Sequence, residues 1–154
     1  MTKLKAGLSL ILIWVVSLIV PIAQAQTDER RVALVIGNAA YQHVPALANP
    51  RNDAMDLSET LTLAGFEVVE GLDLTRDQMA STIQEFVDRL DGATTGFFFY
   101  AGHGLQVDGR NYMLPIDLRL RSEADLQLQA IDMNLVLAQM ERDPRVNIVV
   151  LDAC

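Results

Sequence analysis

Two apolar runs decide the fold: Gly96-Phe97-Phe98-Phe99-Tyr100-Ala101-Gly102-His103-Gly104 and Val146-Asn147-Ile148-Val149-Val150-Leu151-Asp152-Ala153-Cys154. Each is typical of a buried strand that leads to a reactive group, an imidazole in the first and a thiol in the second. The segment between them is long enough to hold a helix, so the two strands can lie parallel in one sheet. If they are neighbours, about 4.8 Å apart, His103 and Cys154 emerge side by side at the carboxyl edge, where open α/β sheets place their sites.

The rest of the chain predicts an α/β fold with a mainly parallel sheet, helices on both faces and strand order 2-1-3-4. Helix starts are indicated by Asn49 with Pro50, by a capping box at Thr75 and by Asp132. Gly65 and Gly92 mark helix ends. Tyr112-Met113-Leu114-Pro115 reads as a short extended piece, and residues 117–130 give no clear pattern. The expected elements are strands at 31–37 and 66–69 and the two runs above, with helices beginning near residues 50, 76 and 133.

The N-terminus is typical of a secretory signal. Lys3 and Lys5 precede an apolar run over 8–22 and a small-x-small sequence, Ala23-Gln24-Ala25. We expect residues 1–25 to be a bacterial-type signal peptide and 26–154 to be one domain that is exported, either periplasmic or secreted. An uncleaved membrane anchor is the alternative, although the run is shorter than the ~20 residues of a typical span. The formal charge of −8 argues against nucleic acid as a partner.

The chain has a single cysteine, Cys154, so it cannot form an internal disulfide. A thiol next to an imidazole is a nucleophile with its acid–base partner. Gly102 and Gly104 flank His103 and let a substrate backbone approach closely. The backbone N–H groups of Gly104 and Cys154 are then candidates for an oxyanion hole. Metal binding is the weaker interpretation, since one imidazole and one thiol are too few for a closed zinc site, and an inert buried thiol is the default for any cysteine.

Two carboxylates are expected near the same edge. Asp152 and Cys154 are two residues apart on one strand and point to one side, while Asp53 lies in the first turn of the helix after the first strand. A pair of acids lining a pocket would select a basic side chain, arginine above all. For Asp53 a favourable charge at a helix N-terminus is an equally good explanation.

Other polar residues give weaker indications of a functional site. His43 lies in a polar loop and is expected to be exposed, and the phenylalanine run is expected to be core. No cofactor is expected. A calcium site remains open, with four acidic residues as candidate ligands: Asp108, Asp117, Glu123 and Asp125.

Together these residues resemble the large-subunit part of the caspase–metacaspase peptidases. The His103–Cys154 interval of about 50 residues is typical of caspases. The resemblance extends over residues 31–154, with motifs at Arg31–Asn38, Asn52-Asp53-Ala54, Tyr100–Gly104, Tyr112–Asp117 and Leu151–Cys154.

The resemblance implies a caspase-fold cysteine endopeptidase with Cys154 as nucleophile and His103 as its partner. True caspases carry glutamine where Asp152 stands. Metacaspases and paracaspases carry aspartate there, and a second aspartate that matches Asp53. The implied substrates are therefore peptides or proteins cut after Arg or Lys. The family continues beyond its cysteine, so the 154-residue chain is expected to be a fragment, weakly active or inactive alone.

Two other interpretations stay open. A caspase fold can serve as a non-catalytic interaction module, which would not react with an arginine-ending alkylating peptide. An unrelated flavodoxin-like or receiver-like domain would make the pairing of His103 with Cys154 a coincidence.

Overall fold

A four-stranded parallel sheet forms the centre of the computed structural model, which describes residues 29–153. The strands are β1 (Arg31–Gly37), β2 (Phe66–Leu72), β3 (Thr95–Gly102) and β7 (Val146–Ala153), and their order is β2-β1-β3-β7. This is the order predicted from right-handed crossovers, and the fold class is confirmed. The predicted signal peptide, residues 1–25, lies outside the described residues.

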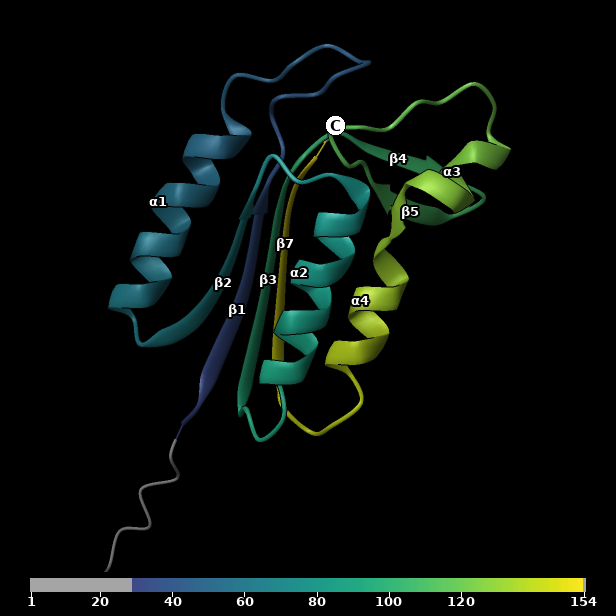
Figure 1. Cartoon of the computed structure of the whole chain (residues 1–154). Helices are drawn as coiled ribbons and strands as arrows, with labels where there is room; N and C mark the ends of the chain where they lie inside the picture. The colour runs from purple at the N-terminus through teal and green to yellow at the C-terminus, as the bar shows by residue number, and fades with distance from the viewer. Residues whose placement is uncertain (1–28, 154) are drawn as a thin grey trace, which may run out of the picture.

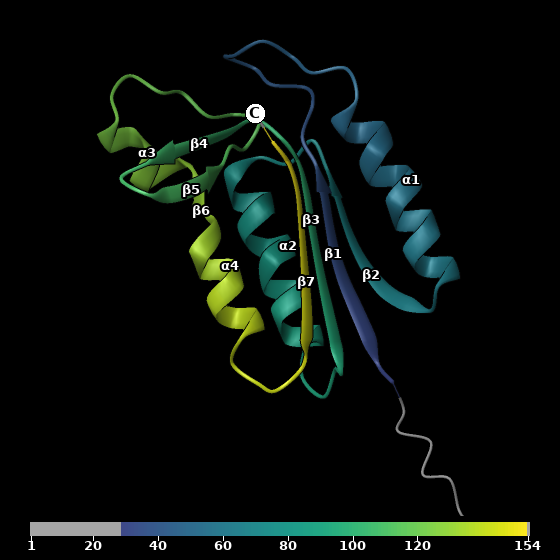
Figure 2. The same cartoon turned by 180° about the vertical axis from the view of Figure 1, so that it is seen from behind.

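Helices cover both faces of this sheet (Figures 1 and 2). Helix α1 (Pro50–Leu63) lies on one face, while α2 (Arg76–Arg89) and α4 (Met133–Met140) lie on the other. Parallel strands joined by helical crossovers need this arrangement, because both faces of such a sheet are apolar. The central strand β1 is buried over Val32–Gly37 for this reason.

The helix ends follow the predicted signals closely. Thr75 and Gln78 form the expected reciprocal capping box of α2, and the Asp132 carboxylate accepts a hydrogen bond from Asn134 N–H at 2.9 Å to cap α4. Asn49 occupies the N-cap of α1 with Pro50 after it, but its side chain makes no capping hydrogen bond, so that part of the prediction is wrong. The Asn49 backbone is already helical (φ −104°, ψ −31°), whereas a capping side chain needs an extended N-cap residue.

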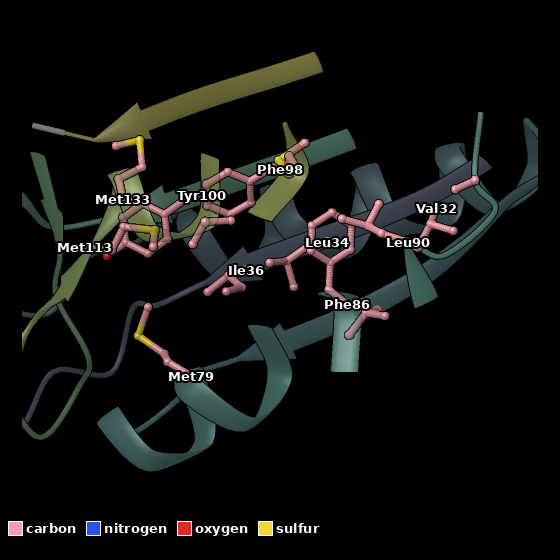
Figure 3. Packing of buried hydrophobic residues seen from close by; sticks show 14 residues of the cluster. Val32, Leu34, Ile36, Met79, Phe86, Leu90, Phe98, Tyr100, Met113 and Met133 are labelled. Carbon is pink, nitrogen blue, oxygen red and sulfur yellow. The ribbon is translucent and has the colours of Figure 1, made fainter. Parts of the chain in front are cut away.

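The larger core lies between the sheet and the α2–α4 face (Figure 3). Even-numbered residues of β1 and β3 point into it and meet the apolar stripe of α2. Odd-numbered residues face α1 instead and belong to a second, smaller core. Consecutive side chains of the phenylalanine run therefore lie in different cores, because side chains alternate between the two faces of a strand. The core residues labelled in Figure 3 are Val32, Leu34, Ile36, Met79, Phe86, Leu90, Phe98, Tyr100, Met113 and Met133.

A small second sheet follows β3 and was not predicted. Strands β4 (Gly104–Val107) and β5 (Arg110–Met113) form an antiparallel hairpin, and β6 (Ile131–Asp132) pairs with β5. Asp108 and Gly109 make the two-residue turn with φ of 49° and 75°. Both central residues of a type I′ turn need positive φ, and an Asp-Gly pair is a strong signal for it. The predicted extended piece at Tyr112–Pro115 is thus partly a strand, and the unassigned region contains the short helix α3 (Ala124–Gln129).

Strand β7 forms one edge of the parallel sheet and has only β3 beside it among the described strands. All of its residues are exposed, including apolar ones such as Val146 and Leu151. In the part of the chain that the structure covers, no helix has the length and apolarity needed to cross a membrane.

Candidate active site

His103 follows directly after β3, at the carboxyl edge of the sheet, and its side chain is half-buried. Its Nε2 atom lies 2.8 Å from the carbonyl oxygen of Pro45. A carbonyl oxygen can only accept, so the nitrogen facing it carries the proton. In the neutral ring this leaves Nδ1 without a proton, available to a neighbouring acid.

The loop that carries Pro45 connects β1 to α1 and is held at several backbone atoms. Gln42 N–H donates to the Ile116 carbonyl at 2.8 Å, and Leu47 N–H donates to the Ala39 carbonyl at 3.0 Å. The carboxylate of Asp73, which follows β2, accepts from the N–H groups of Ala39 and Ala40, both at 2.8 Å. Pro45 is therefore held in position by the ends of β1 and β2 together.

Two tyrosines contact the candidate histidine directly. The ring of Tyr41 lies against the His103 imidazole, with a centroid distance of 4.6 Å and a tilt of 51°. The backbone N–H of His103 donates to the Tyr41 hydroxyl at 2.8 Å, and the Tyr100 hydroxyl donates to the His103 carbonyl at 2.7 Å. Tyr41, Tyr100 and Pro45 were not predicted to be site residues. The only available signals were the tyrosine and the proline in the loop after the first strand, and the tyrosine that follows the phenylalanine run.

The second predicted group, Cys154, lies outside the described residues. The structure brings the neighbouring residue close to the histidine strand, since β3 and β7 pair in parallel up to Gly102 beside Ala153. A Cβ atom added to Gly104 would lie 3.2 Å from the Ala153 Cβ. The backbone that contains the candidate oxyanion donor Gly104 therefore touches the residue directly before the cysteine.

The two predicted specificity carboxylates lie on the α1 side of the sheet. Asp152 pairs in register with Ala101, whose side chain belongs to the core under α1. Asp53 is in the first turn of α1 and is half-buried, whereas Asp152 is exposed. Neither carboxylate makes a hydrogen bond or ion pair with another residue of 29–153, so both can accept from a ligand.

A small apolar cavity adjoins this edge on the opposite face. It has a volume of about 250 Å³, and its lining includes Tyr100, Gly104, Leu151 and Ala153. A larger cavity of about 780 Å³ lies between α2 and α4, with Ile83 and Leu135 in its walls. The larger cavity contains none of the predicted site residues, so volume alone does not locate the site.

The other candidate ligands are dispersed or engaged. His43 is exposed, as predicted, and its Nε2 accepts from Arg119 Nε at 2.7 Å. Asp117 accepts from Arg76 N–H at 3.0 Å, and Asp125 accepts from the N–H groups of Arg121 and Ser122. Across residues 29–153, no three His, Cys, Asp or Glu side chains gather closely enough to hold a metal ion.

A comparison with known families matches the same part of the chain. The model of the caspase domain matches residues 30–154, and the chain belongs to this caspase/paracaspase-like peptidase family.

Two curated mammalian relatives match over the same region. The chain is 36% identical over 126 residues to mucosa-associated lymphoid tissue lymphoma translocation protein 1 of Homo sapiens and to its homolog in Mus musculus. The match covers 80% of this chain but only 15% of each relative's length. The similarity therefore concerns one domain of much longer proteins.

Proposed function

We propose that this chain contributes the nucleophile and the acid–base group of a cysteine endopeptidase. The observation that supports this most is the parallel register of β3 and β7, which places Gly102 beside Ala153. The residues directly after these two are His103 and Cys154. Adjacent parallel strands are about 4.8 Å apart, so a thiol and an imidazole that follow them can approach to hydrogen-bonding distance.

In the proposed reaction, the Cys154 thiol gives its proton to His103 Nδ1, and the thiolate attacks the scissile carbonyl carbon. The Gly104 and Cys154 N–H groups stabilise the oxyanion of the tetrahedral intermediate. Its collapse breaks the C–N bond, the imidazolium protonates the leaving amine, and a thioester remains on Cys154. Water, deprotonated by His103, then hydrolyses the thioester and restores the thiol.

We further propose cleavage after Arg or Lys. Asp53 and Asp152 lie on the α1 side of the carboxyl edge with carboxylates that no described side chain neutralises. Two carboxylates can accept a guanidinium bidentately or bind an ammonium group. An acidic side chain would meet two like charges there and be rejected.

The test compares matched peptides ending in Arg, Lys or Asp before a chromogenic leaving group, using the full-length protein. We expect cleavage of the Arg and Lys peptides only, and its loss in Cys154→Ala and His103→Ala. Asp152→Asn should reduce kcat/KM for the Arg peptide by about 10- to 100-fold and leave the reaction of Cys154 with iodoacetamide unchanged. Preferential cleavage of the Asp peptide would contradict the specificity. Failure of an Arg-ending alkylating peptide to label Cys154 would favour the non-catalytic interaction module.

We also propose that the protein is exported and that its reaction needs no cofactor. An exported enzyme cut after Ala25 should begin at Gln26, which N-terminal sequencing of the protein from the producing cell would show. Activity that survives EGTA would support a reaction without calcium. Dependence on added Ca²⁺ would point to the acidic residues Asp108 and Glu123, which lie near α3.

A further inference from the structure

The backbone of His103 is joined to that of Leu114 through two buried hydroxyl groups. On one side, His103 N–H donates to the Tyr41 hydroxyl at 2.8 Å, and this hydroxyl lies 3.2 Å from the Leu114 carbonyl. On the other side, Leu114 N–H donates to the Tyr100 hydroxyl at 3.1 Å, and this hydroxyl donates to the His103 carbonyl at 2.7 Å. A direct bond from Leu114 N–H to the His103 carbonyl, at 3.1 Å, completes the connection.

Hydrogen-bond chemistry and contact distances together assign the protons of this network. A tyrosine hydroxyl has one proton to donate and lone pairs to accept with. Tyr41 accepts from His103 N–H and donates to the Leu114 carbonyl. Tyr100 accepts from Leu114 N–H and lies 2.7 Å from the His103 carbonyl and 3.2 Å from the Leu114 carbonyl, so the shorter contact assigns its proton to His103. Each hydroxyl thus both accepts and donates. Burial raises the pKa of both phenols, that of Tyr100 well above its ordinary value, so both stay protonated at neutral pH.

The space around the hydroxyls is tightly confined. The two oxygens lie 3.3 Å apart, and Tyr41 and Tyr100 are 7% and 1% exposed. Gly102 lies against them with a φ of 155°, and a Cβ atom there would be 2.7 Å from each oxygen. The glycine before the histidine is therefore the residue that admits the hydroxyl pair.

We propose that Tyr41 and Tyr100 are positioning residues of this site, whose paired hydroxyls hold both backbone groups of His103 while Pro45 holds its ring. The proposal rests on the function proposed above, in which His103 moves the protons. Tyr41 and Pro45 belong to the same loop, so one segment fixes the histidine at its amide, across its ring face and at Nε2. The imidazole keeps one tautomer and one orientation, with Nδ1 directed away from Pro45.

Positioning of this kind acts on the rate more than on substrate affinity. A displacement of about 1 Å in a catalytic group costs roughly 100-fold in rate. Tyr41→Phe keeps the ring that packs on His103 but removes the acceptor for its N–H. Tyr100→Phe keeps the core packing but removes the donor to its carbonyl. Neither tyrosine lies among the groups proposed to touch the substrate.

The experiment uses the full-length protein and both Phe variants, with Tyr112→Phe as the matched control. Tyr112 is another buried tyrosine, 6% exposed, and its hydroxyl makes no hydrogen bond to His103 in the described chain. We expect kcat on an Arg-ending peptide to fall about 10- to 100-fold in each of the two variants, with KM changed by less than about twofold. The pH–kcat profile should shift in the same variants and stay unchanged in Tyr112→Phe.

A second measurement, by nuclear magnetic resonance, does not depend on catalytic activity. The ¹⁵N resonances of the His103 ring should show one tautomer in the parent chain and averaged values in Tyr41→Phe and Tyr100→Phe. The His103 amide proton should exchange slowly in the parent, which can be measured even if a variant does not fold. Parent-like kcat and ring resonances in both variants would overturn the proposal, as would rapid exchange of the parent amide. If the parent cuts no peptide, the proposed function fails, while the ring resonances still decide whether the tyrosines position His103.

Discussion

Gly102 admits the two tyrosine hydroxyls because it lacks a side chain, so a single methyl group there should disturb them directly. Gly102→Ala combines an unfavourable backbone conformation with contacts of 2.7 Å to both oxygens. We expect it to lower the free energy of unfolding by about 2–4 kcal/mol, which urea titration would measure.

The control is Gly109→Ala in the β4–β5 turn. Gly109 has a φ of 75°, but nothing lies within 4 Å of an added Cβ. Only the backbone penalty remains, about 1–2 kcal/mol. Equal losses in the two variants would show that the tyrosine pair does not restrict the space at Gly102.

At the residue scale, the sequence indicated His103 and its glycines but not what holds them. The histidine could be found because it ends an apolar run next to residues of unusual conformational freedom. Pro45 acts through its backbone carbonyl, which every residue has, so no residue type reveals it. Tyr41 and Tyr100 are 59 positions apart, and only the fold shows that their hydroxyls meet.

The loop between β1 and α1 depends on one carboxylate. Partial burial of Asp73 disfavours its charge, but hydrogen bonds from the N–H groups of Ala40 and Ala39 and from Arg51 outweigh this, so its pKa is lowered. A lowered pKa in the folded state means that the ionised form stabilises the fold at pH values above the ordinary pKa of aspartate, about 3.9. This stabilisation is lost as the pH falls through the folded-state value.

Asp73→Asn should therefore destabilise the protein by about 1–3 kcal/mol at pH 7. The difference from the parent should shrink as the pH is lowered below about 4, because the parent's carboxylate is then protonated too. Thermal unfolding across this pH range would measure it. Asp77→Asn is the control, since the Asp77 side chain is 95% exposed. A pH-independent difference at position 73 would contradict the role of the charge.

Helix α4 offers a separate test of capping. Asp132 accepts from Asn134 N–H, so Asp132→Ala should cost about 1 kcal/mol in unfolding free energy. Asp132→Asn retains an oxygen acceptor at the cap and should recover most of that loss. If both variants were equally destabilised, the contribution would come from the Asp132 charge near Arg110, 3.6 Å away, and not from the cap.

Element by element, the sequence predicted the parallel strands and the three longer helices within a few residues. These have apolar periodicity together with glycine, proline or capping residues at their ends. The second sheet was missed because its strands are only two to four residues long, too short for a periodic pattern. The Asp108-Gly109 pair was a sufficient signal for its hairpin. Helix α3 lies in a polar stretch and is held by tertiary contacts, through the buried Leu126.

The whole molecule depends on the packing of α2 against the sheet. Phe86 is fully buried between them, so Phe86→Ala should cost about 3–5 kcal/mol and lower the melting temperature accordingly. Leu63→Ala, at a side chain that is 83% exposed, is the control and should change stability by less than about 0.5 kcal/mol. Calorimetry would compare the two, and a small effect at Phe86 would contradict this account of the core.

The parallel pairing of β3 with β7 also has a kinetic consequence. Strand β3 can pair with β1 as soon as both are made, whereas β7 leaves the ribosome last among the described strands. Under the proposed function, the Cys154 thiol reaches the imidazole only after β7 has docked on β3. We therefore expect an Arg-ending alkylating peptide to label only chains in which β7 has docked, so that the labelling rate of newly made chains reports when this strand joins the sheet.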